Sequence, residues 1–444
     1  MVQARYKQLV DNLAADIHNG LLSPGTQLPT HRQLARQEKI ALVTASRVYT
    51  ELERMGLVSG ETGRGTFVRE TALPPGHGID QLAPREGMID LNFNSPALPR
   101  QTEMLRKALR QVAISGDINA LLHYQPHAGR THERAIIAHH LDARGLNVRA
   151  DNIVIVSGAQ QGLAATVMSR LQPGDVIAVD ALTYSGFKVL AELHHLELVP
   201  IPINDDGPNL TALAQLCQQR RVKAVYSMPT LHNPLGWIMT QAQRQQLVAI
   251  ARQHQLLIIE DAAYAFLADN PPPPLQTLAP ERTFYVSGLS KSVATGLRIG
   301  FIAAPLADVP LLERTIRAIA WNTLALITAI ACGWIEDGTV AQLETDKRQD
   351  AAIRQALAHK VFKGLHQASH PNGYFIWLYL PEEARADQVV MALSNANISV
   401  STADPFSTSE HVPHAIRLAL GSVCLERLQS ALETVRQVID EHSY

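Results

Sequence analysis

Six short apolar runs, separated by helical patterns, dominate the chain between residues 153 and 303. Each run is four or five residues long, and such continuous apolar runs are typical of strands that are buried on both faces of a sheet. Strands that alternate with helices predict an α/β domain with a largely parallel sheet. The predicted strands are Ile153–Val156, Val176–Val179, Lys223–Ser227, Leu256–Ile259, Thr283–Val286 and Ile299–Ala303.

Size and composition limit the class of protein. The chain has 444 residues, of which 46 % are apolar and 18 % charged, so it can form two or three domains with sizeable cores. The formal net charge of −2 indicates neither nucleic-acid nor membrane binding. The start of the chain is polar, and no apolar run approaches the ~18 residues that a membrane span requires. With three widely spaced cysteines, these features predict a cytoplasmic protein without a membrane segment.

The start of the chain has a different pattern. Apolar residues recur at helical spacing from Tyr6 to Ile17, and two further short helices are expected between Thr30 and Gly56. Two β-type runs then flank Glu61–Gly65, which predicts a hairpin with Arg64 between two glycines at its tip. Three helices followed by such a hairpin indicate a winged helix-turn-helix, whose third helix would enter the major groove of DNA.

A segment rich in Pro and Gly, residues 71–87, follows this module and lacks periodicity, so we expect a linker there. It separates a DNA-binding domain over residues 1–70 from an α/β domain over residues 88–444. Long helical patterns beyond residue 310 and short strand patterns near the end predict a smaller α+β subdomain. We expect a large subdomain at about 118–310 and a small one at about 88–117 plus 311–444.

Polar side chains follow several of the predicted strands, and the carboxyl ends of parallel strands meet at one edge of a sheet. Lys291 is a primary amine that can condense with an aldehyde, and Asp261 can pair with a protonated ring nitrogen. Tyr264 and Asn233 can both donate to a ring hydroxyl, and Tyr184 can stack on a ring face. Pyridoxal 5′-phosphate (PLP) carries these groups, so the residues predict a PLP site.

The phosphate of PLP requires hydrogen-bond donors and positive charge. Ser157–Gly162 follows a predicted strand directly and opens a helix, where free backbone N–H groups suit an anion. Arg298 would add a fixed positive charge. The residues that we expect to contribute backbone groups are Gly158, Ala159 and Gln160.

Three motifs of the first domain resemble GntR-type winged-helix regulators. They are Pro24-Gly-x-x-Leu28-Pro-Thr-x-Arg32-x-Leu-Ala35, Leu52-x-x-x-Gly56-Leu and Gly63-Arg-Gly-Thr-Phe67-Val. The resemblance implies DNA contacts from Arg32, Thr44, Arg47, Arg64 and Gly65. Ala41-Leu42-Val43 stands where the family usually has a polar start to its recognition helix. Base recognition is therefore expected to depend on Arg47, on apolar contacts with thymine methyl groups, or on the wing.

The order of the strand-end residues resembles the fold-type I aminotransferases over most of the second domain. The resemblance implies that Tyr124 reaches the phosphate in a neighbouring subunit, so the chain would form a homodimer with shared sites. It also implies that Arg417 binds the α-carboxylate of a substrate or effector, which suits the fork of a guanidinium. Gly288 stands where the family has a phosphate-binding serine, and Ser287 or Ser290 would supply that contact instead.

A GntR-like winged helix, a linker and an aminotransferase-like domain in this order resemble the MocR/GabR subfamily of bacterial transcriptional regulators. The resemblance implies a nucleoid-associated factor that binds double-stranded operator DNA and holds PLP as an aldimine on Lys291. An amine or amino-acid effector would displace the lysine and change the affinity for DNA.

Two other functions fit the same residues. The chain can be a catalytically active PLP-dependent aminotransferase with a vestigial or tethering first domain, since every group needed for transamination is present. It can also be a PLP-binding regulator of a partner protein without any role for DNA. No metal site is expected. The adjacent pairs His139–His140 and His194–His195 project in different directions from a helix, and they are interpreted as surface residues.

Overall fold

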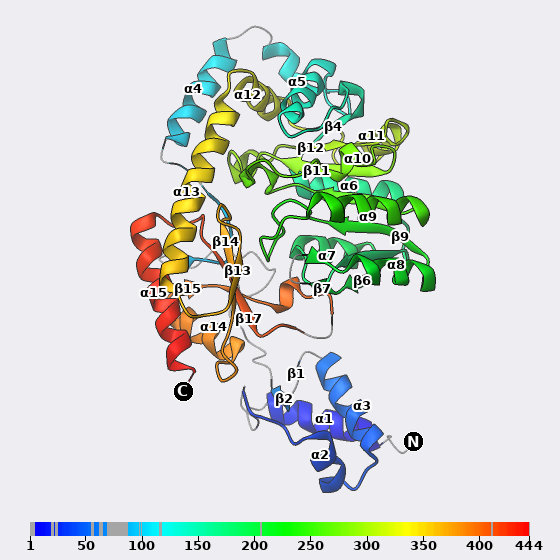
Figure 1. Ribbon diagram of the computed structural model, residues 1–444, viewed down its shortest axis with the longest axis vertical. Helices are drawn as coiled ribbons and strands as arrows, with labels where there is room; N and C mark the ends of the chain where they lie inside the picture. The colour runs from blue at the N-terminus through cyan, green and yellow to red at the C-terminus, as the bar shows by residue number, and fades with distance from the viewer. Residues whose placement is uncertain are drawn as a thin grey trace.

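The computed structural model describes residues 5–18, 22, 25–54, 57–61, 65–68, 88–96, 98, 100–114, 118–204, 207–409 and 412–443. Figure 1 shows a small N-terminal module at one end of the molecule and an α/β body in two parts. The expected linker at residues 71–87 and the wing residue Arg64 lie outside the described residues. None of the described helices has an apolar stretch long enough to cross a membrane.

Three helices and a hairpin form the N-terminal module, as the sequence predicts. Thr30 caps the second helix, because its hydroxyl accepts the N–H of Gln33 at 3.3 Å and its own N–H donates to the Gln33 side chain at 2.8 Å. Ala45, Val48 and Leu52 on the third helix are fully buried in the module's own core. The elements are α1 (Arg5–His18), α2 (His31–Gln37), α3 (Leu42–Arg54), β1 (Val58–Glu61) and β2 (Gly65–Val68).

The wing strand β2 contacts the small part of the body. The guanidinium carbon of Arg385, directly before α14 (Ala386–Asn395), lies 4.0 Å from the centre of the Phe67 ring. In the same region the side-chain amide of Gln388 comes within 3.1 Å of the position that a Cβ atom would take at Gly25. The start of α14 therefore packs on the winged-helix module.

The large part of the body is built on a seven-stranded sheet with the order β4-β12-β11-β10-β9-β5-β6. All neighbouring strands are parallel except β12, which runs antiparallel to β11 and to β4. All six predicted strands are present, and the edge strand β6 was missed because it contains a proline and begins with an exposed glutamate. The strands are β4 (Ile153–Val156), β5 (Val176–Asp180), β6 (Glu197–Ile201), β9 (Val222–Ser227), β10 (Leu257–Asp261), β11 (Thr283–Gly288) and β12 (Gly300–Ala303).

Helices cover this sheet, and several begin directly after a strand. They are α5 (Thr131–Asp142), α6 (Ala159–Arg170), α7 (Ser185–Leu193), α8 (Leu210–Gln219), α9 (Gln241–Gln253), α10 (Leu275–Leu278), α11 (Val309–Ile319) and α12 (Ala325–Glu336). A short hairpin, β7 (Ile203–Asn204) with β8 (Gly207–Pro208), lies at the edge next to β6. The alternation of strand and helix is the α/β architecture that the apolar runs predict.

The small part contains an antiparallel sheet with the order β13-β14-β17-β16 and a parallel pair of β3 with β15. Its strands are β3 (Ile89–Asp90), β13 (Gln367–Ser369), β14 (Phe375–Tyr379), β15 (Ile398–Ser399), β16 (Ser401–Thr402) and β17 (Ala415–Ala419). Its helices are α13 (Thr339–Val361), α14 and α15 (Leu425–Glu441). Residues 88–96, which include β3 and which we call the arm, cross from this part toward the large sheet.

The boundary between the large and the small part of the body, judged by helix packing, lies later in the chain than residue 310. Helix α11 contacts α6 and β4, and helix α12 contacts α5, so both pack on the large sheet rather than on the small one. Helix α4 (Gln101–Ile114), expected in the small subdomain, packs on α12. The long helix α13 runs past both parts (Figure 1). The boundary expected at residue 310 therefore falls at the start of α11, whereas the packing changes after α12.

Candidate functional site

The polar residues predicted at strand ends gather at one edge of the large sheet. Asp261 is the last residue of β10, and Lys291 follows β11 by three residues. Tyr184, directly before α7, lies at the centre of the group. Burial raises the pKa of the Tyr184 hydroxyl, as do the nearby Asp261 and Tyr264, while Arg298 and Arg417 act in the opposite direction. Five of the predicted site residues are therefore close enough to influence one another's charge.

The Asp261 carboxylate is buried and held by hydrogen bonds. Its side chain is 1 % exposed, and its two oxygens accept hydrogen bonds from the Tyr226 hydroxyl at 2.8 Å and from the Ala263 N–H at 3.0 Å. Burial raises the pKa of the Asp261 carboxyl to about 6, although both hydrogen bonds favour the ionised form. A buried carboxylate of this kind is suited to a positively charged ring nitrogen, which would offset the cost of its burial.

Lys291 lies at the junction of the two parts of the body. Its Nζ atom donates to the main-chain oxygen of Asn94 in the arm at 2.6 Å. The same Nζ atom lies 5.9 Å from the centre of the Tyr264 ring, which packs edge-on against Phe375 at 5.2 Å. The primary amine is therefore next to Tyr264, as the sequence predicts, and it also contacts the arm, which the sequence did not predict.

The predicted phosphate site is a narrow cradle around Gly158. Arg298 has a left-handed backbone with φ of 49°, and its Nη1 atom donates to the Ser290 hydroxyl at 3.1 Å. A Cβ atom at Gly158 would lie 2.6 Å from Nη2 of Arg298, so only glycine allows the guanidinium to lie there. Ala159 begins α6, where the first N–H groups have no partner within the helix. The cradle therefore combines a cation, a hydroxyl and a helix N-terminus.

The side chain of Gln160 makes a contact that the sequence did not predict. Its side-chain amide donates to the main-chain oxygen of Gly186 at 3.0 Å, and its buried Oε1 atom has no hydrogen-bond partner. Gln160 therefore ties the start of α6 to the start of α7. Only its backbone N–H is directed by the helix toward the cradle.

The structure explains the glycine at position 288. A Cβ atom there would lie 2.8 Å from the main-chain oxygen of Ile299 and 3.2 Å from the Cα atom of Gly300. We expect Gly288→Ser to lower the free energy of unfolding by about 1–3 kcal/mol, because backbone must move to admit the side chain, and not to strengthen PLP binding. Urea unfolding and a PLP titration would measure both effects. Gly296→Ser is the matched control, because no atom lies within 4 Å of its Cβ position. Tighter PLP binding by Gly288→Ser would contradict this expectation.

Asn233 directly follows a buried histidine that the sequence did not single out. Asn233 is 3 % exposed, and its Oδ1 atom has no hydrogen-bond partner. The preceding His232 is fully buried, stacks on Trp237 with ring centres 4.2 Å apart, and lies 3.4 Å from a carboxylate oxygen of Asp180. The unpartnered Oδ1 atom is an acceptor that is available for a donor group of a ligand.

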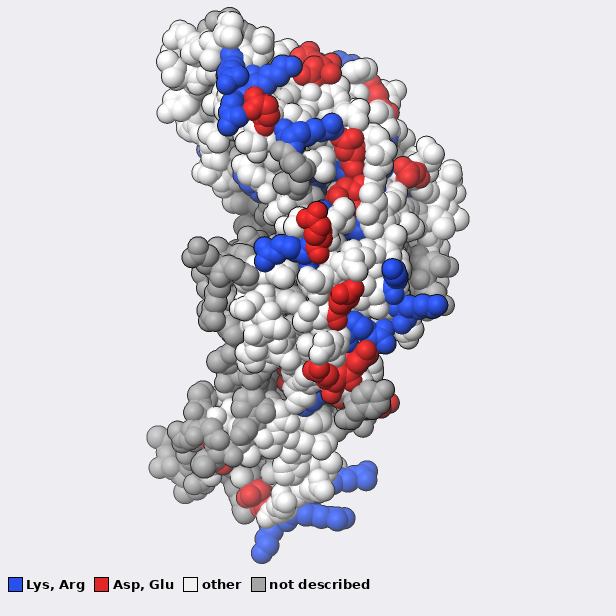
Figure 2. Space-filling view, turned by 90° about the vertical axis from the view of Figure 1, so that its left-hand side faces the viewer, with Lys and Arg blue, Asp and Glu red and all other residues white. Residues whose placement is uncertain are grey.

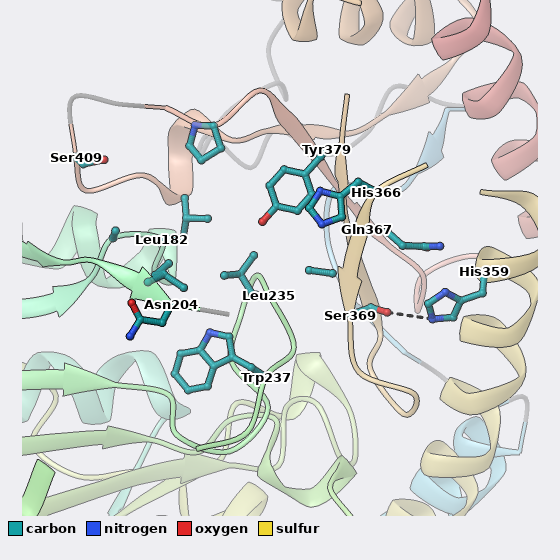
Figure 3. Close-up of a pocket in the computed structure, with 14 residues that line it drawn as sticks. Leu182, Asn204, Leu235, Trp237, His359, His366, Gln367, Ser369, Tyr379 and Ser409 are labelled. Atoms are coloured by element: carbon teal, nitrogen blue, oxygen red, sulfur yellow. Dashed lines mark hydrogen bonds between the residues drawn. The ribbon is translucent and has the colours of Figure 1, made fainter. Parts of the chain in front are cut away.

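A cavity of about 650 Å³ lies behind the Asn233 loop, between the two parts of the body. Figure 3 shows Trp237 and Leu235 of this loop facing His366 and Tyr379 of the small part. The cavity is lined by none of the predicted cofactor residues, so it is separate from the group around Lys291. Because both parts line it, a rotation of the small part would change its volume.

Arg417, the expected carboxylate-binding residue, is buried next to the arm. It lies on β17, is 6 % exposed, and has its guanidinium carbon 5.0 Å from the centre of the Phe406 ring. Its Nη2 atom donates to the main-chain oxygen of Asn92 in the arm, and its Nε atom has no partner. Burial lowers the pKa of Arg417. A carboxylate at this point would satisfy a cation that is otherwise bound by a neutral carbonyl.

Tyr124 lies away from the other site residues. Its side chain is 82 % exposed, and its ring centre is 5.3 Å from that of Trp321. The contacts of this chain do not bring it to the phosphate cradle. A role of Tyr124 at the phosphate of a second subunit therefore stays a prediction.

The residues expected to contact DNA lie on the N-terminal module. Arg32 is exposed on α2, and Arg47 is exposed on α3 with its guanidinium carbon 4.1 Å from the centre of the Tyr6 ring. Thr44 is half-buried on the same helix, and Gly65 begins β2 with φ of 123°. Figure 2 shows basic side chains that project from this end of the molecule.

Three residues of the site region carried no recognisable sequence signal. Tyr226 on β9 reaches Asp261 only because these two strands are neighbours in the sheet. Asn94 and Lys347 belong to segments far from Lys291 in the sequence, yet both bind to it or to its main chain. A search for polar residues at strand ends finds none of them, because their positions depend on strand order and on the docking of the small part.

One expectation about histidines is wrong. His139 is exposed and pairs with Asp142, but the side chain of His140 is only 10 % exposed and packs edge-on against Phe301. Burial lowers the pKa of His140 to about 3, with further contributions from Arg144 and His139. Within the described part of the chain, no three His, Cys, Asp or Glu side chains are grouped so as to hold a metal ion.

The grouped residues fit PLP. Asp261 is a buried carboxylate suited to a protonated ring nitrogen, Asn233 has an acceptor without a partner, and Gly158 leaves the space that the Arg298 guanidinium occupies. Lys291 would supply the amine, and the paired Ser290 and Arg298 would be the phosphate ligands. These are the four kinds of group that the cofactor requires.

Comparison with known proteins supports the division into two domains. Residues 5–68 match the family described as bacterial regulatory proteins of the gntR family, and residues 86–435 match aminotransferase class I and II. The chain is 28 % identical over 441 residues to the uncharacterized HTH-type transcriptional regulator YdeF of Bacillus subtilis, covering 98 % of this chain and 94 % of that protein.

Two other similarities cover the second domain. The HTH-type pyridoxine biosynthesis transcriptional regulator PdxR of Corynebacterium glutamicum is 25 % identical, over 80 % of this chain and 76 % of that protein. The crystal structure of a multiple substrate aminotransferase from Thermococcus profundus superimposes with a TM-score of 0.73 and 25 % identity, over 80 % of this chain and 92 % of that one. With a gntR-type winged helix joined to a PLP-dependent fold-type I domain, the chain belongs to the aminotransferase class I and II family and, within it, to the MocR/GabR subfamily of GntR-type regulators.

Proposed function

We propose that this protein is a PLP-dependent transcriptional regulator that binds operator DNA through its winged helix and senses PLP, an amine or an amino acid through the Lys291 site. The observation that carries the proposal is the combination of two intact parts in one chain. The DNA-binding module keeps an exposed recognition helix, and the aminotransferase-like domain keeps every group that PLP needs. Relatives that match over nearly the full chain are regulators by name.

The DNA-facing surface would be the start of α3 with its apolar residues. Leu42 is 48 % and Val43 is 80 % exposed, although apolar side chains of this size are normally buried. Contact with thymine methyl groups would remove them from water, so they suit direct readout of A·T pairs. Arg47 and Arg32 would add contacts to base edges or phosphates on either side. The wing, through Gly65 and Arg64, would approach the adjacent groove.

We expect Arg47→Ala to weaken binding to operator DNA by about tenfold to a hundredfold, because one charged contact to the duplex is lost. Fluorescence anisotropy with the DNA upstream of the protein's own reading frame would measure this loss. Arg149→Ala is the matched control, because it removes the same charge from a side chain that is 84 % exposed on the large part of the body. Equal affinity of both variants for the DNA would show that Arg47 does not contact it.

The PLP site would work through the described side chains. When bound, PLP supplies an aldehyde that primary amines attack and a ring that withdraws electrons. Lys291 would offer its amine to that aldehyde, and Asp261 would hold the proton on the ring nitrogen. Tyr264 and Asn233 would bind the ring hydroxyl, and Tyr184 would cover the ring. Ser290, Arg298 and the start of α6 would hold the phosphate, and Arg417 would bind an effector carboxylate.

A homodimer would complete the site. Around Tyr124 the surface is unusually apolar, which is typical of a region covered by another subunit. Tyr124 at 82 % and Trp321 at 42 % contact each other, and their chain neighbours Leu122 at 78 % and Leu324 at 66 % are exposed as well. Tyr124 would then reach the phosphate cradle of the second copy. Two winged helices in one dimer would bind two operator half-sites, and such a regulator would act in the cytoplasm on the nucleoid.

The decisive experiment is binding of the purified protein to its own upstream DNA at two salt concentrations, with and without PLP. Salt-dependent, sequence-selective binding that changes with PLP or with an added amine is the expected result. Binding that is equal on any duplex and insensitive to PLP and to every amine tested would contradict the proposal.

A working aminotransferase is the second candidate. It is favoured by the completeness of the PLP groups and by 28 % identity, over 65 % of the chain, to the aromatic-amino-acid aminotransferase 1 of Thermococcus litoralis. Multiple turnovers with an amino donor and an oxo-acid acceptor would support this function. A single half-reaction without turnover would favour the regulator.

A further inference from the structure

A fully buried lysine, Lys347, lies in the middle of α13. Its Nζ atom donates to three main-chain oxygens, those of Val293 at 2.7 Å, Pro96 at 2.8 Å and Lys291 at 3.1 Å. An ammonium group has three N–H donors, so these oxygens satisfy it completely. No carboxylate forms an ion pair with it within the described part of the chain. Lys347 therefore acts as a three-way clamp on the backbone.

The three oxygens belong to the segments that matter most for the PLP site. Two of them come from Lys291 itself and from the residue two positions later, so Lys347 fixes the backbone from which the Lys291 side chain extends. Gln101 from α4 donates to the same Val293 oxygen at 2.7 Å. The third oxygen, that of Pro96, is at the end of the arm.

The arm in turn binds two of the cationic side chains of the site, Lys291 and Arg417. The main-chain oxygen of Asn94 accepts from Lys291, and that of Asn92 accepts from Arg417. The arm is anchored to the small sheet through the Asn94 side chain, which accepts the N–H of Gly421 at 3.1 Å. A ligand that bonds to the Lys291 amine would compete with Asn94 for that group, and a carboxylate on Arg417 would lie next to the Asn92 oxygen. The arm is also the first part of the second domain after the residues that join it to the winged helix.

The carboxylates near Lys347 are paired with other side chains, so the three carbonyl oxygens are its main partners. Asp350 is engaged by Arg354 at 2.7 Å and by the Tyr374 hydroxyl at 2.9 Å, and Glu344 is engaged by Arg144 at 2.6 Å. The pKa of Lys347 is lowered to about 7, mainly by burial and also by the charge of Lys291, while Asp350 and Glu344 act in the opposite direction. Each of the three carbonyl oxygens favours the protonated form, because only that form supplies three donors.

We infer that Lys347 is a positioning residue that holds the Lys291 backbone and the arm together, so that ligand binding at Lys291 is transmitted to the arm. This inference deepens the proposed function, because the arm is the covalent route to the winged helix. Its test concerns PLP and the arm alone. A failure of the inference would therefore leave the regulator proposal standing, and a failure of DNA binding would leave the inference standing.

The test compares Lys347→Met with Gln355→Met in the full-length protein. Methionine preserves the unbranched stem of either side chain and removes its donors. Gln355 is a matched control because it lies two turns along α13, is 1 % exposed, and donates to the main-chain oxygens of Gly373 and Phe375, each at 2.8 Å. Both variants lose buried donors to backbone oxygens, but only Lys347→Met releases the Lys291 loop and the arm.

Two readouts separate positioning from a merely structural role. We expect Lys347→Met to weaken PLP binding at least about tenfold more than Gln355→Met does, and to shift the pH at which the visible absorbance of bound PLP changes. Hydrogen exchange in the PLP-free proteins should be faster over residues 88–96 and 289–294 in Lys347→Met only. If the two variants bind PLP equally and exchange residues 88–96 at the same rate, Lys347 is structural and the inference is wrong.

A third measurement does not depend on any variant folding. In the wild-type protein, saturating PLP should change the exchange rate of amides in residues 88–96, because Asn94 loses its hydrogen bond from Lys291. Unchanged exchange over the arm on addition of PLP would overturn transmission to the arm, whatever the variants do.

Discussion

Lys291→Ala is expected to abolish stable retention of PLP and to weaken its binding by about a hundredfold or more, equivalent to roughly 3 kcal/mol or more. The variant removes the only group of the site that can bond covalently to the aldehyde. The contacts of Asp261, Ser290 and Arg298 would remain and give weak, reversible binding. Absorbance spectra after dialysis, and the mass of the Lys291 peptide after borohydride reduction, would measure the loss.

The control for this change is Lys360→Ala, which removes an exposed lysine from α13. It should retain one PLP per chain and the spectrum of the wild type. If Lys291→Ala keeps the cofactor through dialysis, or if borohydride attaches PLP to another lysine of the wild type, the assignment of Lys291 is wrong.

Asp261→Asn is expected to have the second largest effect, and its sign depends on pH. Burial raises the pKa of the Asp261 carboxyl to about 6 in the protein without cofactor. Above this pH the carboxylate is ionised and can pair with a protonated ring nitrogen. Below it the carboxyl is neutral, so the affinity for PLP should fall by up to about tenfold per pH unit. Asp261→Asn should bind PLP weakly throughout and lack this part of the pH dependence.

The same carboxyl affects the stability of the cofactor-free protein in the opposite direction. Its pKa is about 6 when folded and near 3.8 when unfolded, so the folded protein binds more protons between these values. Its contribution is therefore most favourable below pH 3.8 and is lost as the pH rises to 6, by roughly 2–3 kcal/mol. Urea unfolding at several pH values would measure this, with Asp151→Asn as a control at an exposed carboxylate. Identical pH profiles for wild type and Asp261→Asn would contradict the assigned role.

The residues that sequence analysis could find are those whose positions follow from the chain near them. Asp261 ends an apolar strand, Gly158 joins a strand to a helix, and Arg298 precedes a strand, so each is directed to the same edge by the sheet. The winged helix was predictable for a similar reason, because helical spacing buries Ala45 and Leu52 and a Thr30 cap starts α2.

The residues that it could not find depend on contacts between distant segments. Tyr226 reaches Asp261 through strand order, and Lys347 reaches the Lys291 backbone through the docking of α13. The residue type alone does not show whether a lysine is buried or exposed, and no local sequence pattern marks Lys347 as buried. His140 is a similar case, since only the packing of α5 on Phe301 makes it buried.

The length of α13 has a mechanical consequence. Its 23 residues make one unbroken helix of about 34 Å, with Lys347 beside the Lys291 loop and Ala358 in the core of the small sheet. Bending such a helix would break its internal hydrogen bonds, so it behaves as a rigid lever with its fulcrum near Lys347. From Lys347 to the end of the helix at Val361 the lever is about 21 Å long, so a tilt of about 5° at that fulcrum would move the far end by roughly 2 Å. The end of the lever lies in the part that carries α14 and Arg385, so a displacement too small to disturb the PLP pocket would be amplified where the wing strand rests.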